Sequence, residues 1–430
     1  MNFRKYILFY SIASFFLLLF SLLWCSISDD SAYYLCIARD ISRGLVPYKD
    51  ISNVYTPVMM YWNSLLFFFM EEFYYPAFLG FQYIVIMTCS FWLYKITTVF
   101  LGLEKAKSFL LCLFFVIATW SSDGTYINLE VYVIFFVFCS LWNFFKKNYT
   151  LTGLFLGISF FCKQYGLFHF IPFYFFILFY EEKKWNNSLR LSMGGLIPLI
   201  VFLVYYVCYQ SLDIKTLIHQ ITGQGIMKYY SRADENYLSL IWGGKVFFLL
   251  LLPVLLQSRF IFRDKIQKFC FFGMIINLLP AFVQSFQHYF LLAFPYLFLI
   301  LASTHFQTKI EKIFWRILHI CIILIILLLA LRLYRYRGLS EEQNFFAEQI
   351  AKQIPKKSTV FLDGWIRYLY LKNEYKNPLL QQTGYSFVYS LDPEWQKKFP
   401  ILSSEKQDGL EIKKQIFLRN KVIYLYRDEK

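Results

Sequence analysis

The sequence predicts an all-α polytopic membrane protein with about 11 transmembrane helices, followed by a small C-terminal α/β domain. Composition is the first reason, because 58% of the 430 residues are hydrophobic and 22% are aromatic, more than one soluble core needs. The second reason is length: apolar runs of about 15 to 24 residues recur, and such helices cross a hydrocarbon core of about 30 Å. These runs also lack the residue alternation of an outer-membrane barrel.

Eleven apolar runs are expected to span the membrane. They cover residues 7 to 25, 77 to 100, 107 to 121, 131 to 145, 150 to 162, 166 to 180, 191 to 210, 240 to 256, 269 to 284, 288 to 304 and 314 to 332. With the N-terminus in the cytoplasm, every inward loop carries a Lys or Arg cluster, as the positive-inside rule requires. These clusters account for the net charge of +15, so the charge indicates topology rather than a nucleic-acid partner.

The first run follows basic residues, as the core of a signal peptide does. Its apolar stretch is long and no small-residue cleavage site follows, so it is expected to remain as the first helix. The lack of a eukaryotic sorting signal and the compact size favour a bacterial inner membrane, with the C-terminal domain outside the cytoplasm. The nine Cys are scattered without a C-x-x-C motif, which argues against a disulfide framework or a zinc site.

Two domains are expected. The transmembrane domain covers residues 1–336 and includes a first outer loop, 26–76, with interfacial helices. One of these is the short segment "TPVMMYWNSLLFFFM" at 56 to 70, because counting it as a span would move all later basic clusters to the outer side. Residues 337–430 form the soluble domain, with an amphipathic helix in "SEEQNFFAEQIAKQIP" and strands in "STVFLDG" and "KVIYLYR". This tail has no catalytic cluster of its own, so its expected role is acceptor selection.

Unusual polar residues of the apolar part gather on one side of this topology, at outer helix ends or in outer loops. They are Asp29, Asp30, Asp50, Asn128, Glu130, Lys163, Gln164, Arg232 and His288. An ion near the hydrocarbon is costly unless it is paired or faces a wet cavity, so such a gathering predicts a functional site.

Each of these residues also has a purely structural interpretation. Asp29 and Asp30 precede a helical pattern and would cap its N-terminus, a role compatible with that of a general base held in place. Glu130 would be another cap, and Lys163 would snorkel to the headgroups. His288 would sit at the interface and Arg232 in solvent.

The first outer loop, "DDSAYYLCIARDISRGLVPYKDI", resembles that of the C-type (GT-C) membrane glycosyltransferases, in the branch of protein O-mannosyltransferases and lipid A aminoarabinose transferases (glycosyltransferase family 39-like). The shared positions are Asp29-Asp30, Tyr33, Ala38, Gly44, Pro47-Tyr48, Asp50, Thr56-Pro57 and Tyr61-Trp62. Two positions depart from the pattern: Asp30 stands where Glu is usual, and Thr56-Pro57 replaces a Pro pair. "NLE" at 128 to 130, "KQYG" at 163 to 166 and "HYFLLAFPYLFLI" resemble later motifs, so the likeness covers about 300 residues in order.

This resemblance implies a GT-C-like fold and a transferase that takes a sugar from a polyprenyl-phosphate donor at the outer face of the inner membrane. The acceptor would be a protein, lipid A or a surface glycan, and membrane lipids would surround the site. Asp29 would be the general base of an inverting displacement, while Asp30 and Glu130 would orient it or bind a divalent cation, Mg²⁺ or Mn²⁺. The substrate-binding residues would be Lys163, Gln164, His288, Tyr289, Arg232, Asn128, Asp50 and Tyr33.

Two other functions are also considered for this sequence. A transporter or flippase of a polyprenyl-linked sugar also needs many spans and polar groups, but transporters usually carry charges at the membrane midplane and helices broken in related halves. A non-catalytic scaffold that presents the outer domain leaves the Asp pair and Lys163 unexplained.

Overall fold

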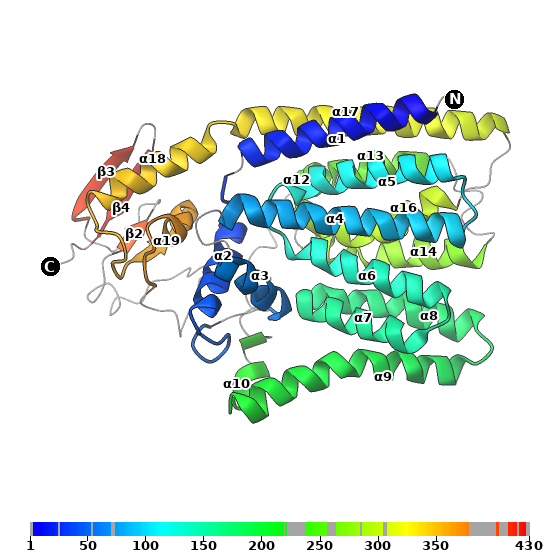
Figure 1. Cartoon of the computed structure of the whole chain (residues 1–430), viewed down its shortest axis with the longest axis horizontal. Coiled ribbons are helices and arrows are strands. Elements are labelled where there is room, and N and C mark those ends of the chain that lie inside the picture. The colour runs from blue at the N-terminus through cyan, green and yellow to red at the C-terminus, as the bar shows by residue number, and fades with distance from the viewer. Residues whose placement is uncertain are drawn as a thin grey trace. The chain divides into compact units, whose positions relative to one another are not determined.

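The structure is a computed structural model of the whole chain and is mostly helical (Figure 1). It describes residues 3–24, 26–52, 55–69, 74–218, 220–221, 237–255, 264–283, 286–303, 308–377, 401–403, 412–418 and 421–426. The chain divides into two compact units. The first unit comprises Met1–Leu23, Leu79–Ser211 and Gln224–Tyr334, and the second comprises Trp24–Phe78, Leu212–Gly223 and Arg335–Lys430.

The first unit contains the apolar helices, and Figure 1 shows its long members running along a common direction. Its elements are α1 (Phe3–Leu23), α4 (Tyr74–Val99, from Leu79 on), α5 (Lys105–Thr119), η1 (Trp120–Gly124), α6 (Leu129–Phe145), α7 (Tyr149–Cys162), η2 (Gln164–His169), α8 (Phe170–Tyr180), α9 (Lys184–Leu203), η3 (Val204–Tyr209), α12 (Tyr237–Gly243), α13 (Lys245–Leu255), α14 (Lys265–Ile276), α15 (Leu279–Val283), η5 (Gln287–Ala293), α16 (Phe294–Ala302) and α17 (Thr308–Tyr336).

Close helix packing organises the core of this unit. A Cβ on Gly153 of α7 would lie 1.9 Å from the Leu191 carbonyl oxygen of α9, and one on Gly194 would lie 2.0 Å from that of Thr150. Glycine is therefore required where these two backbones touch, as in other membrane helix pairs with small residues at the contact. Every residue of α16 is buried, so this helix lies at the centre of the unit.

Each of the eleven expected spans coincides with an apolar helix. Six helices in the described part of the chain are long and apolar enough to cross a membrane: Arg4–Leu23, Tyr75–Val99, Lys105–Gly124, Lys184–Tyr209, Lys265–Phe282 and Glu311–Ala351. The other five expected spans coincide with apolar helices of 10–17 residues. The full count of about 11 and the orientation of the termini stay predictions, because the short helices alone do not reach the usual spanning length of roughly 20 residues.

The second unit joins the first outer loop to the C-terminal tail, so the loop that we expected within the transmembrane domain clusters with residues after Arg335. Its helical elements are α2 (Asp29–Ser42), α3 (Val58–Phe69), α10 (Ile214–Ile218), α18 (Leu339–Ala351), η6 (Gly364–Tyr368) and α19 (Leu369–Lys372). Its strands are β1 (Phe361–Asp363), β2 (Ile401–Ser403), β3 (Lys414–Leu418) and β4 (Lys421–Leu425).

The four strands form one sheet in the order β1-β2-β4-β3. β1 and β2 are parallel, and the other two pairings are antiparallel. The amphipathic helix expected at 340 to 355 is α18, and the two expected strands contain β1 and β4. α3, the expected interfacial helix, is apolar almost throughout and leaves part of its apolar surface exposed: Met60 and Asn63 are fully buried while Phe68 is 74% exposed. Its depth in the membrane stays a prediction.

Candidate functional site

The loop after α5 is shaped by one buried amide. Gln82 of α4 is fully buried, and its Nε2 donates to the carbonyls of Gly124 at 2.8 Å and Tyr126 at 2.6 Å. Its Oε1 accepts the Asn128 N–H at 2.9 Å. The Asn128 side chain in turn donates to the Asp123 carbonyl at 2.6 Å. These bonds hold Asp123 in a left-handed conformation, φ 66°, which Asp tolerates better than most residues.

Glu130 follows this loop at the second position of α6, where its side chain is fully buried. Its Oε1 lies 2.5 Å from Nζ of Lys163, which is 1% exposed. The Lys163 ammonium also lies 4.7 Å from the centre of the Tyr289 ring and 5.6 Å from that of Tyr165. A buried ammonium held by a carboxylate and two aromatic faces does not snorkel to the surface, so that structural interpretation of Lys163 is wrong.

The "KQYG" break explains how Lys163 is aimed. Lys163 is extended (φ −160°, ψ 142°) between α7 and the 3-10 helix η2. Its carbonyl accepts the Gly166 N–H at 2.8 Å. A Cβ on Gly166 would lie 2.4 Å from the Ser159 carbonyl carbon, so only glycine allows η2 to fold back on α7. The motif thus turns one residue out of the helical repeat and directs its side chain at Glu130.

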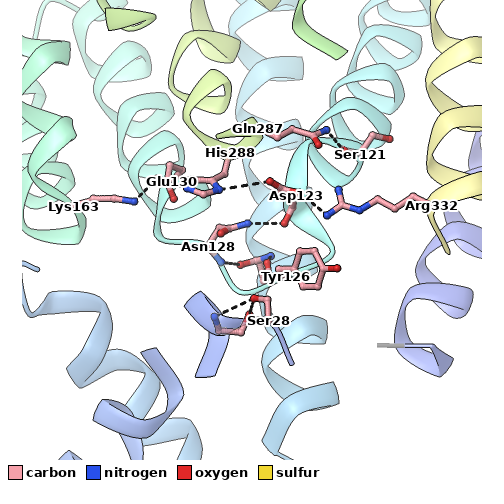
Figure 2. Close-up of polar contacts among 12 residues, drawn as sticks. Ser28, Ser121, Asp123, Tyr126, Asn128, Glu130, Lys163, Gln287, His288 and Arg332 are labelled. Carbon is pink, nitrogen blue, oxygen red and sulfur yellow. Dashed lines mark hydrogen bonds and ion pairs between the residues drawn. The ribbon is translucent and has the colours of Figure 1, made fainter. Parts of the chain in front are cut away.

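Five side chains from five elements form a row in which acids alternate with bases, here called the charged row (Figure 2). Lys163 contacts Glu130, and the Glu130 Oε1 lies 3.8 Å from Nε2 of His288. The other ring nitrogen of His288 lies 3.6 Å from the Asp123 carboxylate. Asp123 also forms a 2.6 Å ion pair with Arg332 of α17. The row therefore connects α6, η1, η5 and α17 with the junction between α7 and η2.

The charges in the row nearly balance. Lys163 and Arg332 offset Glu130 and Asp123, and the imidazole of His288 stands between the two carboxylates, so its protonation would leave the row with one excess positive charge. Within the described residues, Oε2 of Glu130 and Nη1 of Arg332 are buried without a hydrogen-bond partner. Buried polar atoms are normally satisfied, so such orphans indicate a place for water or a polar ligand.

Candidate residues of the first outer loop belong to the second unit. Ser28, rather than either Asp, caps α2, so the interpretation of Asp29 and Asp30 as the cap is wrong; they are the first two residues of the helix. The Asp29 side chain lies outside the described part, and Asp30 is half-buried. The Asp50 carboxylate accepts the Val46 N–H at 2.8 Å and thereby closes a turn.

Tyr33, the other candidate of this loop, is buried on α2. Its ring packs edge-on against those of Tyr34 and Tyr55, with centroids 5.6 and 5.5 Å apart. This packing fits an anchoring role within the loop.

Several of the expected site residues lie close together in the first unit. Glu130, Lys163, His288 and Tyr289 lie together, Asn128 shapes the adjoining loop, and Gln164 begins η2. Arg232 lies outside the described residues. The described chain holds no group of three or more His, Cys, Asp or Glu side chains placed to bind a metal ion.

Sequence reasoning missed two members of the charged row. Asp123 stands before Gly124 in a polar loop, where it looks like an ordinary turn residue. Arg332 stands near the end of the last apolar run, where basic residues usually mark the membrane interface. The signal that was available is that Arg332 still has four apolar or aromatic neighbours in "ALRLY".

The fold of this chain is similar to that of a protein of known structure. Neither a family model nor a curated protein sequence matches this chain. Among solved structures, ArnT from Cupriavidus metallidurans in the apo state matches with a TM-score of 0.66, covering 99% of this chain and 98% of that chain at 10% identity. The chain has the fold of ArnT.

A second crystal structure, of the same ArnT bound to undecaprenyl phosphate, matches with a TM-score of 0.61, covering 98% of each chain at 11% identity. Because both matches span nearly all of this chain, they include the helical part and the C-terminal tail together. The expected GT-C-like fold is thereby supported, while the count of about 11 spans stays a prediction.

Proposed function

We propose that this chain is a membrane glycosyltransferase that transfers a sugar from a polyprenyl-phosphate donor to an acceptor at the outer face of the inner membrane. The observation that carries the proposal is the buried Lys163 ammonium, held beside Glu130 and two aromatic rings in a chain with the fold of ArnT. ArnT is a C-type glycosyltransferase, and one of its structures contains undecaprenyl phosphate, which supports a donor of the same chemical class here.

The charged row suits the leaving group of such a reaction. When the bond between the anomeric carbon and the phosphate oxygen breaks, the electron pair stays on the phosphate, which gains negative charge. Lys163, and His288 when protonated, would stabilise that charge from largely buried positions. Glu130 holds the ammonium in position before the donor arrives, so no reorganisation is needed at the moment of reaction.

The base is assigned to the first outer loop. Asp29 would accept the proton of the acceptor hydroxyl as its oxygen attacks the anomeric carbon, which gives inversion in one displacement. Asp29 is the first residue of α2, whose start is capped by Ser28, so its backbone has a defined position. Asp30 would orient the acceptor, and the proposed role of Asp29, Asp30 and Glu130 in binding a divalent cation, Mg²⁺ or Mn²⁺, stays an expectation from sequence.

The remaining substrate-binding residues are also divided between the phosphate of the donor and the acceptor. Gln164 and Tyr289, next to Lys163, and Asn128 would line the phosphate side, whereas Tyr33 and Asp50 would support the acceptor side. Arg232 is proposed as a further cation for the phosphate. The acceptor class stays as expected from sequence: a protein, lipid A or a surface glycan.

The test supplies purified full-length protein in lipid nanodiscs with radiolabelled undecaprenyl-phosphate sugars and candidate acceptors of each class. We expect transfer of label and release of undecaprenyl phosphate. Asp29→Asn should express normally and lose about 10²- to 10⁴-fold in kcat, the usual contribution of a general base. Asp213→Asn is the matched control, because Asp213 is likewise an acidic residue at a helix start, where it accepts the Thr216 N–H at 3.0 Å.

Two results would overturn the proposal. Absence of both transfer and donor hydrolysis, with every sugar and acceptor, would contradict a transferase. Movement of the intact donor between the leaflets of a liposome without cleavage would favour a flippase instead.

A further inference from the structure

The start of α2 is fixed from outside the helix. Asp29 and Asp30 occupy its first two positions, and Ser28 caps it through an oxygen that accepts the Ser31 N–H at 3.2 Å. A cap fixes the geometry of the first turn, but it does not fix the direction in which the chain enters the helix. That direction depends on what holds the residue before the cap, Ile27.

Gln343 of α18 holds this residue. Its Oε1 accepts the Ile27 N–H at 3.0 Å, and its Nε2 donates to the Ile27 carbonyl at 2.8 Å. The two residues are 316 positions apart in the sequence and are 5% and 8% exposed, respectively. One amide side chain therefore satisfies both backbone groups of Ile27, as a neighbouring strand would, in a place where water does not compete.

A second contact holds the far end of α2. Arg39 is 6% exposed, and its Nη1 donates to the carbonyl of Tyr370 in α19 at 2.5 Å. α18 and α19 are themselves joined, because the Asn373 side chain donates to the Ala347 carbonyl at 3.0 Å. The helix that begins with the acid pair is thus held at both ends by one block of the C-terminal tail.

We propose that Gln343 is a positioning residue for the acid pair: by holding Ile27, the tail sets the position of the first turn of α2, which carries Asp29 and Asp30. The inference rests on the proposed function, in which Asp29 is the base. It also gives the tail a role that its sequence did not indicate, since it becomes part of the catalytic framework rather than only a module that selects the acceptor.

The experiment compares Gln343→Leu with Gln349→Leu, a matched control on the same helix that is only half-buried. Leu removes both bonds to Ile27 at a similar side-chain volume. We expect kcat for sugar transfer to fall about 10- to 100-fold, because a misplacement of about 1 Å in a reacting group can cost 10²-fold. The affinity for undecaprenyl phosphate should stay unchanged, since the residues assigned to the phosphate lie in the other unit.

Hydrogen exchange of the full-length protein provides a readout that needs no activity. The peptide containing Ile27 should exchange faster in Gln343→Leu than in the wild type or the control, while peptides from α6 and α16 stay unchanged. Gln343→Glu serves as a second variant if Leu impairs folding. It keeps the acceptor for the Ile27 N–H but sets a carboxylate against the Ile27 carbonyl, so it too should speed exchange and lower kcat.

Each outcome decides the inference. A loss of kcat with intact donor affinity and faster exchange at Ile27 supports it. Faster exchange with unchanged kcat, an equal loss of donor affinity, or unchanged exchange overturns it. If the wild type itself transfers no sugar, the proposed function fails, and exchange alone then decides whether Gln343 holds Ile27.

Discussion

The charged row of the first unit and the start of α2 in the second unit position their functional groups in different ways. In the row, opposite charges hold each other in place: inside a helical bundle, Lys163 is paired with Glu130 and Arg332 with Asp123. At α2, the neutral Gln343 amide and the Ser28 hydroxyl hold the backbone, and the acidic residues occupy the first two positions of the helix. Substitutions in the row should therefore disturb stability and activity together, whereas substitutions at α2 should act mainly on activity.

The largest effect is expected for Lys163→Met. This change leaves the Glu130 carboxylate buried without its cation, which typically costs about 3–5 kcal/mol. Thermal unfolding in nanodiscs should show a large drop in melting temperature. The double variant Lys163→Met/Glu130→Gln should regain most of that stability, because no buried charge is left alone, while sugar transfer remains lost. A single variant as stable as the wild type would contradict the buried pair.

A smaller effect is expected for Arg332→Met. The Asp123 carboxylate loses a 2.6 Å partner but keeps His288, and the Asp123 and Arg332 side chains are 16% and 20% exposed. We expect a loss of about 1–3 kcal/mol, the usual cost of leaving one buried partner unsatisfied. Arg335→Met on the same helix is the control, because Arg335 is exposed and should change little. Equal losses of stability in the two variants would show that the ion pair between Arg332 and Asp123 does not stabilise the protein.

The smallest effect is expected in the second unit, at Cys36 of α2. Burial raises the pKa of the Cys36 thiol in α2 to about 12, so the thiol should stay protonated and resist maleimide at pH 8. Above the ordinary pKa of 9.0, the unfolded chain releases the Cys36 proton while the folded state keeps it. This group should therefore lower the free energy of unfolding only as the pH rises above about 9. Gln343→Leu should allow some labelling of Cys36 if the tail holds α2 in place. Rapid labelling of the wild type would show that α2 is not held.

The sequence predicted the helices well because lipid imposes a strong constraint: each apolar run must satisfy its own backbone, so all eleven expected ranges contain a helix. Lys163 and Glu130 were found for the same reason, since a charge among apolar residues is costly. How many helices span the bilayer was harder to predict, because breaks such as that at Lys163 shorten them.

What the sequence did not reveal are partners chosen by tertiary structure. Asp123 joins the row only because the Gln82 amide holds its loop. The sequence around Gln82, "FLGFQYIVI", gives no sign of its hydrogen bond to Gly124. Gln343 looks like a residue of the polar face of an amphipathic helix, yet it is buried against Ile27. Polar side chains that bind backbone groups more than 300 residues away leave no local pattern to read.

The most direct test of the central claim is the affinity for undecaprenyl phosphate, measured by equilibrium binding to protein in nanodiscs. We expect the wild type and Asp29→Asn to bind alike, Glu130→Gln to bind as well, and Lys163→Met/Glu130→Gln to bind at least tenfold more weakly. A double variant that binds as tightly as the wild type, or a folded wild type that does not bind at all, would contradict a phosphate held by Lys163.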